Sequence, residues 1–208
     1  MELLKQGYTQ QAFQRYTEDV VALRMAAWRP RGCVLHNTWA PRLSQWPGIV
    51  DGKPISEAQR IENMSVRWKN SGWRSGPHLF IAPDRIWTAT PLWLRGTHSP
   101  SFNATHWGIE LVGEYDTETL PDVLRDNAVH AMACLYAMLG HAPTPANFRF
   151  HGEDPRTSHK RCPGRNVHPK EWWDAAIEAR MAELSPGDCA IPDNDRHSPC
   201  PRPRVRGD

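Results

Sequence analysis

The feature that most constrains this chain is a turn-rich segment, residues 150–164, that carries two good metal ligands. Its sequence is FHGEDPRTSHKRCPG, and its glycine, proline, aspartate and serine residues favour a loop. His151 supplies an imidazole and Cys162 a thiolate, and zinc binds both. Because a zinc site needs three or four protein ligands, this pair predicts a metal site only if the fold brings another ligand to it.

Lys160 lies two residues before Cys162. Side chains two residues apart in a strand point to the same side, so an extended conformation here would direct a cationic group and a metal ligand into one cavity. His159 competes with His151 as a ligand, but its position next to Lys160 leads us to expect an exposed ring.

Length and composition are those of an ordinary globular protein. The chain has 208 residues, enough for one domain with a substantial core, and 39% of them are hydrophobic. With 25 basic and 23 acidic residues the net charge is +2, so we expect no nucleic-acid partner.

The N-terminus lacks the basic and apolar regions of a signal peptide, and no apolar stretch approaches the ~20 residues of a transmembrane helix. We therefore expect synthesis in the cytoplasm. We also expect a monomer.

The cysteines do not form a disulfide framework, because their number is odd and their spacing irregular. Cys33 and Cys134 lie in apolar segments and are expected to be buried. Cys189 and Cys200 could pair in an oxidising compartment.

The hydrophobic pattern predicts alternating helices and strands. Helical spacing of apolar residues predicts helices over residues 8–28, 56–69, 120–139 and 170–184. Short apolar runs predict strands over residues 33–36, 78–82, 86–89, 107–113 and 148–151, the second and third forming a hairpin. From residue 185 onward proline, aspartate and arginine predominate, which predicts a disordered tail.

Two further residues have side chains suited to a site. His36 stands at the C-terminal end of the run 33–36, and such strand ends collect ligand-binding groups in mixed α/β folds. Glu110 lies inside an apolar strand, where a carboxylate is costly unless it is paired or bound to a metal. Taken singly, His36 could be a core histidine, Cys162 a buried thiol and Lys160 a solvated charge.

Four segments in this order resemble the zinc-dependent N-acetylmuramoyl-L-alanine amidases related to peptidoglycan-recognition proteins, which include phage endolysins. They are VLHNT at 34–38, GPHLFI at 76–81, GIELVG at 108–113, and His151 followed by KRCPG at 160–164. The resemblance covers roughly residues 32–172. It implies an α/β fold with a central mixed β-sheet flanked by helices, and a zinc-bearing groove on one face. We expect an N-terminal helical extension at 1–30, one catalytic domain at 31–184 and the tail at 185–208.

The resemblance also implies roles for individual residues. It places one zinc ion per chain on His36, His151 and Cys162, which leaves a position of the tetrahedron open, as catalysis requires. Lys160 matches the lysine that stabilises the oxyanion. Glu110 matches the acidic residue that serves as general base in part of the family.

Other positions are less defined. Many relatives carry a tyrosine where this chain has Pro77, so the identity of the proton shuttle stays open. His78 and His98 are candidates for binding substrate or for orienting a neighbouring ligand. For His98 and His106, lining the groove and lying on the surface are equally expected. Some tryptophans are expected to stack on sugars and most to pack in the core; the candidates are Trp39, Trp46, Trp73, Trp93 and Trp107.

The resulting functional prediction is zinc-dependent hydrolysis of the amide bond between N-acetylmuramic acid and L-alanine in peptidoglycan. Without a signal peptide, a phage endolysin would reach the cell wall after release, with holin-type delivery. A cytoplasmic amidase that recycles muropeptides would use the same residues. A non-catalytic recognition module is a third reading, although such relatives typically lack the cysteine that is present here as Cys162. A purely structural zinc site would require a fourth ligand, and the sequence offers no convincing one.

Overall fold

A central six-stranded mixed sheet organises the protein. The structure is a computed structural model that describes residues 3–26 and 28–184; the predicted tail at 185–208, with Cys189 and Cys200, lies outside the described residues. The strand order is β1-β6-β5-β7-β2-β8. The strands are β1 (Gln6–Tyr8), β2 (Gly32–Asn37), β5 (Leu79–Ile81), β6 (Ile86–Thr88), β7 (His106–Leu111) and β8 (Phe148–Phe150).

The register of the parallel strands places the two candidate residues of the sheet side by side. The pairs β5–β7, β7–β2 and β2–β8 are parallel. The pairs β1–β6 and β6–β5 are antiparallel. His36 of β2 is directly opposite Glu110 of β7. On the other side of β2, Leu35 is opposite Phe150, the last residue of β8. The predicted strands and the hairpin of β5 and β6 are thus confirmed.

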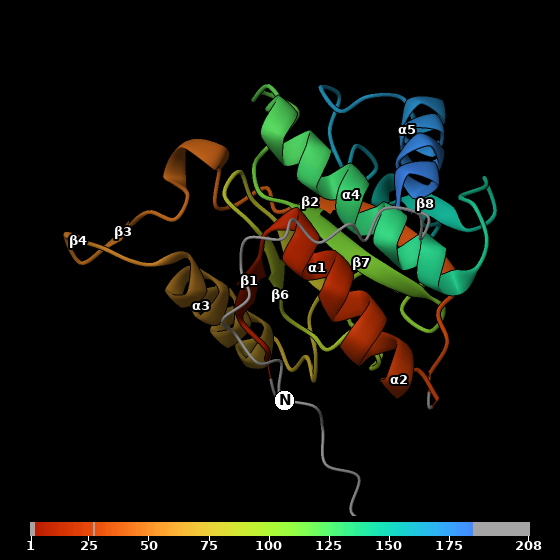
Figure 1. Ribbon diagram of the computed structural model, residues 1–208. Coiled ribbons are helices and arrows are strands. Elements are labelled where there is room, and N and C mark those ends of the chain that lie inside the picture. Colours follow the sequence, from red (N-terminus) through yellow and green to blue (C-terminus); the bar gives the residue numbers. More distant parts are fainter. Residues whose placement is uncertain (1–2, 27, 185–208) are drawn as a thin grey trace, which may run out of the picture.

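Helices α1 (Gln10–Tyr16), α4 (Asp122–Leu139) and α5 (Lys170–Glu183) pack on one face of the sheet. Figure 1 shows α1 and α4 crossing this face together. Gly140 ends α4 in the left-handed conformation, with φ of 74°, directly after the predicted helix 120–139. Buried side chains of these helices meet those of the sheet, among them Phe13, Met132, Trp173, Leu35 and Ile109.

The N-terminal segment differs from the predicted helical extension. Residues Gln6–Tyr8 form the edge strand β1, which pairs with β6, so this segment is part of the central sheet. The predicted helix 8–28 is divided into α1, a π-helical turn at Thr17–Val21 and the short α2 (Ala22–Arg24). The predicted helix is therefore confirmed over Gln10–Arg24, where the three helical pieces follow one another without a break. The strand at Gln6–Tyr8 was not predicted, because its pairing with β6 depends on residues far away in the sequence.

The opposite face of the sheet is covered only in part, by helix α3 (Glu57–Asn70). Ser56, the first residue of the predicted helix 56–69, accepts a hydrogen bond from the Gln59 amide, as an N-cap does. Ile61 of α3 packs against Phe80 and other residues of this face. Because Leu35 and Ile109 point into the helix-covered core, strand alternation directs His36 and Glu110 to this second, partly open face.

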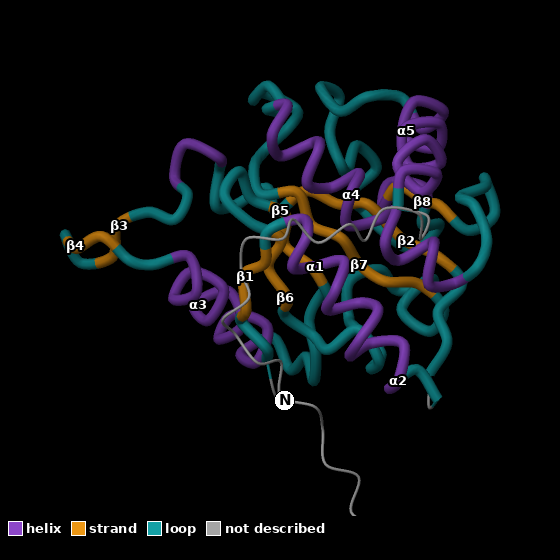
Figure 2. The backbone as a smooth tube through the Cα atoms, in the orientation of Figure 1, coloured by secondary structure: helices purple, strands orange, loops and turns teal. Residues whose placement is uncertain are grey.

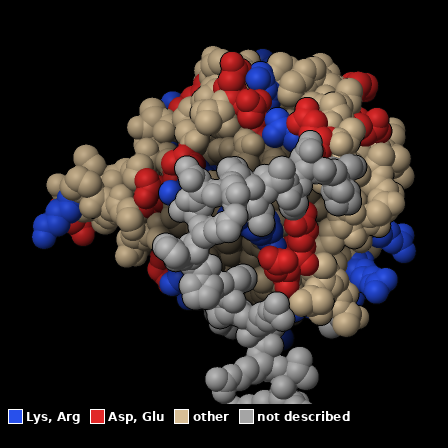
Figure 3. All heavy atoms as spheres, in the orientation of Figure 1, with Lys and Arg blue, Asp and Glu red and all other residues tan. Residues whose placement is uncertain are grey.

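The segment between β2 and α3 projects from the body. It contains a short 3-10 turn at Leu43–Gln45 and a small hairpin of β3 (Ile49–Val50) and β4 (Lys53–Pro54), which extends away from the sheet in Figure 2. Acidic and basic side chains are interspersed over the described part of the face in Figure 3, in keeping with the balanced composition. Within residues 3–26 and 28–184, no helix has the length and apolar character to cross a bilayer.

Candidate metal and active site

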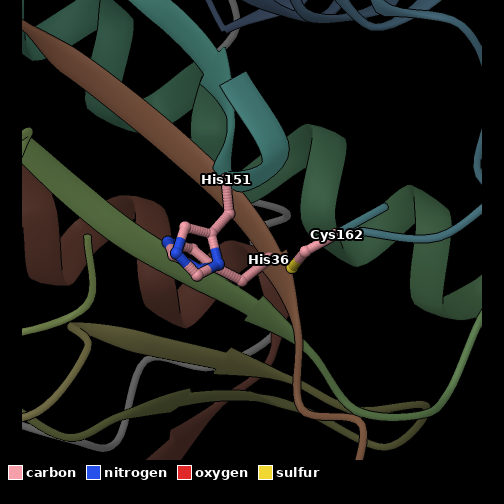
Figure 4. A group of neighbouring side chains, drawn as sticks. All are labelled: His36, His151 and Cys162. Carbon is pink, nitrogen blue, oxygen red and sulfur yellow. The ribbon is translucent and has the colours of Figure 1, made fainter. Parts of the chain in front are cut away.

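Three side chains from separate parts of the chain converge on the open face of the sheet (Figure 4). His36 ends β2, His151 begins a 3-10 turn directly after β8, and Cys162 belongs to the following loop. One donor atom from each residue lies within 4.8 Å of the others. The two imidazole rings are buried, with centroids 4.4 Å apart. The structure thus brings together the three residues that the sequence predicts as zinc ligands.

The loop that carries Cys162 folds back onto the turn that carries His151. The amide of Gly152 donates a hydrogen bond of 2.8 Å to the carbonyl oxygen of Cys162. A Cβ atom at Gly152 would lie 2.4 Å from the carbonyl oxygen of Lys160, so only glycine permits this approach. Residues 160–162 form a turn instead of the strand considered for Lys160 and Cys162, because this backbone closure requires the chain to bend.

The shifted pKa values of His36, His151 and Cys162 suit the binding of a cation. Burial lowers the pKa of His36 well below its usual range, with a further contribution from His98, and burial lowers the pKa of His151 to about 4. Both rings are therefore neutral and have a lone pair to offer. Burial, and then the nearby Glu110, raise the pKa of the Cys162 thiol. In this setting a metal ion would be the group that holds the thiolate.

Asn37 holds the sulfur of Cys162 from one side. Its backbone amide donates to Sγ at 3.4 Å, and its side-chain oxygen lies 3.8 Å from the same atom. Asn37 follows His36 directly, so the last two residues of β2 supply one member of the cluster and one contact to another member, Cys162. Sequence reasoning did not single out Asn37.

Glu110 lies beside the cluster. Its Oε1 atom is 3.9 Å from Nδ1 of His36, and its side chain is 14% exposed. Burial raises the pKa of the carboxyl group to about 8. In its ionised form such a group is a stronger base than an exposed carboxylate, although without metal most of it is protonated near neutral pH.

Lys160 lines the same groove as the cluster, on its exposed rim. Its ammonium group donates a hydrogen bond of 2.7 Å to the main-chain oxygen of Asp154. His159 is exposed, as expected from its position beside the lysine, and its ring centroid is 5.7 Å from that of His151.

Asp154 is fully buried and connects two loops of the site. Its carboxylate accepts hydrogen bonds from the Ser99 hydroxyl (2.5 Å), from the hydroxyl and amide of Ser101 (2.6 and 2.9 Å) and from the Arg156 amide (2.8 Å). Burial opposes ionisation, but these hydrogen bonds lower the pKa of Asp154 well below its usual range. The sequence did not reveal this role, because an aspartate before a proline is an ordinary turn residue.

The remaining histidines named from the sequence are all buried, so the surface alternative for His98 and His106 was wrong. His98 contacts His36, with 3.0 Å between Nδ1 of His98 and Nε2 of His36. His78 donates to the Leu94 carbonyl and accepts from the Gly108 amide, both at 2.9 Å, and its ring stacks on Trp28. His78 is therefore fully engaged inside the fold.

A groove of about 750 Å³ runs over the cluster and includes Pro77, Glu110 and Lys160 in its lining. Trp39 and Trp73 also line it and are 68% and 41% exposed. Trp39 has a φ of 55°, an uncommon backbone conformation for this residue type. Trp107, in contrast, is fully buried and donates to the Leu92 carbonyl. The groove thus offers two exposed aromatic faces beside the candidate metal ligands.

Comparisons with known proteins agree with this geometry. The family model described as N-acetylmuramoyl-L-alanine amidase matches residues 26–165. The endolysin amidase LysCS from Clostridium intestinale superposes with a TM-score of 0.54 at 23% identity, over 73% of this chain and 86% of that one. Wild-type PGRP-LB from Drosophila gives 0.52 at 21% identity, over 81% and 86%. A PGRP-LB mutant in complex with tracheal cytotoxin gives 0.52 at 22%, over 67% and 78%. No curated protein matches the sequence.

Proposed function

Because this chain belongs to the N-acetylmuramoyl-L-alanine amidase family, we propose that it is a zinc hydrolase that cleaves the amide bond between N-acetylmuramic acid and L-alanine in peptidoglycan. The observation that carries the proposal is the meeting of two imidazoles and a thiol within 4.8 Å at an open groove, beside a carboxylate that is only 14% exposed. Burying such polar groups together is costly for folding alone, which favours a functional role.

The donor set fits zinc. Zinc binds imidazole nitrogen and thiolate sulfur at about 2.0–2.3 Å, and three protein ligands are characteristic of catalytic sites. His36, His151 and Cys162 would hold the ion. When bound, zinc polarises a substrate carbonyl and lowers the pKa of water to near neutrality.

Glu110 has the position and basicity of the general base. It faces His36 at 3.9 Å, and its raised pKa of about 8 allows it to take a proton from the attacking water and to return that proton to the departing amine. Pro77 lines the groove where many relatives have a tyrosine. Proton transfer is therefore assigned to Glu110.

Lys160 and the two exposed tryptophans would act on the substrate. The ammonium group of Lys160 has two further protons beyond the one bound to Asp154. It can therefore donate to the oxygen of the scissile amide as negative charge develops there. Trp39 and Trp73 present flat apolar faces suited to sugar rings.

A direct test measures the release of free stem peptide from purified peptidoglycan by mass spectrometry. The wild type loaded with zinc should release it, and both a chelator and Cys162→Ser should reduce release to background. Cys134→Ser is the matched control, because Cys134 is a buried thiol on α4 outside the cluster. Comparison of intact sacculi with soluble muropeptides would separate endolysin-type lysis from muropeptide recycling.

A non-catalytic recognition module is the second candidate function. It is favoured by the fold shared with a PGRP-LB mutant whose structure contains bound tracheal cytotoxin, and opposed by the presence of Cys162 in the cluster. A zinc-loaded wild type that binds muropeptide but releases no stem peptide would decide for this alternative.

A further inference from the structure

His98 links His36 to the protein backbone through two hydrogen bonds. Nε2 of His98 is 3.0 Å from the carbonyl oxygen of His106, and Nδ1 of His98 is 3.0 Å from Nε2 of His36. The rings of His36 and His98 stand almost perpendicular, at 85°. The three groups form a linear chain that begins at a fixed main-chain atom of β7.

This chain determines which nitrogen of His36 carries the proton. A carbonyl oxygen can only accept, so Nε2 of His98 must be the protonated nitrogen. In a neutral imidazole the other nitrogen then accepts, so Nδ1 of His98 receives a hydrogen bond from Nε2 of His36. Nδ1 of His36 is left with a free lone pair, and this atom faces Glu110 at 3.9 Å.

We infer that His98 is a positioning residue that holds His36 in the tautomer able to bind metal through Nδ1. The inference rests on the proposed zinc site, and it decides between the two roles that the sequence left open for His98. Both of its ring nitrogens are occupied and its side chain is buried. Neither nitrogen is therefore free for substrate.

The surrounding chain is built to hold the ring of His98. A Cβ atom at Gly108 would lie 2.4 Å from Cγ of His98, so the absence of a side chain there makes room for the imidazole. The Asn103 side-chain oxygen accepts from the amides of His98 and Ser99, each at 2.8 Å. Ser99 is in turn bound to Asp154. The position of the ring is thus determined by the loop and by β7 together.

The first test is zinc affinity, measured by competition with a chromophoric chelator. His98→Leu removes both hydrogen bonds and should weaken zinc binding roughly 10–100-fold, the range for loss of an outer partner of a metal-binding histidine. His98→Gln should lose less, because an amide can accept from His36 and donate to the carbonyl. His106→Gln is the matched control: it alters a buried neighbouring histidine but keeps the carbonyl, and should change affinity less than about twofold.

Circular dichroism establishes which variants are folded. A folded His98→Leu protein that binds zinc as tightly as the wild type would overturn the inference. So would a His106→Gln protein that is weakened as much as His98→Leu.

A second test needs no variant with an altered His98. Long-range proton–nitrogen NMR spectra of the metal-free wild type distinguish the two neutral tautomers of histidine, with His36→Gln used for assignment. Both His36 and His98 should carry the proton on Nε2. A proton on Nδ1 of His36 would overturn the inference even if the substituted proteins failed to fold.

These measurements are independent of catalysis. A wild type that shows the expected tautomer and zinc affinity but releases no stem peptide would contradict the proposed hydrolysis and leave the role of His98 intact. A wild type that binds no zinc would overturn both.

Discussion

The ammonium group of Lys160 donates a hydrogen bond to the main-chain oxygen of Asp154. The carboxylate of the same aspartate accepts hydrogen bonds from the hydroxyl groups of Ser99 and Ser101. One aspartate therefore orients the proposed catalytic lysine and joins the loop that carries His98 to the turn that begins at His151. Substitution of Asp154 should therefore lower both stability and activity.

Replacement of Asp154 by alanine should destabilise the protein by about 3 kcal/mol, because it leaves buried donors of Ser99 and Ser101 without acceptors. Chemical denaturation would measure the loss. Asp126→Ala is the control, since its side chain is 52% exposed and forms a surface ion pair with Arg125; there a change of ~0.5 kcal/mol at most is expected. Equal effects of the two substitutions would refute the structural role of Asp154.

The Asp154 carboxylate should also make stability sensitive to acid. Its pKa in the folded state lies well below the ordinary value of 3.8, so its contribution is fully present above that value and is lost as the pH falls from there toward the folded-state pKa. Asp154→Asn lacks this titration. The difference in free energy of unfolding between wild type and Asp154→Asn should shrink below about pH 4; a constant difference would contradict the assignment.

Substitution of Lys160 by methionine should lower kcat about 100-fold, the effect of losing one donor to an oxyanion. KM and zinc affinity should change little, because the lysine holds neither the metal nor, in this proposal, the ground state of the substrate. Lys53→Met, on the exposed strand β4, is the matched control. An unchanged kcat would remove Lys160 from the mechanism.

Glu110→Gln should reduce kcat by about 10²–10⁴-fold, the contribution of a general base, while zinc remains bound. The variant is nearly isosteric, and it removes a carboxyl group whose burial is unfavourable in the charged form. Its thermal stability without metal should therefore equal or exceed that of the wild type above pH 8. Loss of zinc together with activity would show that Glu110 serves the metal site instead of proton transfer.

Alanine at Trp39 or Trp73 should raise KM for peptidoglycan about 2- to 10-fold, which corresponds to the loss of one aromatic contact. Zinc affinity should stay unchanged, because neither ring belongs to the ligand cluster. Leu23→Ala is a suitable control, since this side chain is 82% exposed and does not line the groove. Wild-type KM values in both tryptophan variants would exclude sugar stacking at these positions.

Features that depend on neighbours in sequence were predictable. The helix at Asp122–Leu139 combines apolar periodicity with a terminal glycine, and the strand at Gly32–Asn37 contains the apolar run Cys33–Leu35. The hairpin of β5 and β6 is formed by strands separated by a short turn. In each case the residues that define the element, or the two strands of the hairpin, lie close together in the sequence.

The sequence by itself therefore determined the order of the main helices and of five strands of the central sheet, and through ordered motifs it nominated His36, His151 and Cys162. The tertiary structure alone decided that Gln6–Tyr8 is a strand, that residues 160–162 turn, that Asp154 joins two loops of the site, and that His98 contacts His36. The physical reason is that these features depend on hydrogen bonds between segments distant in sequence. Such partners are specified only when the sheet brings the segments together.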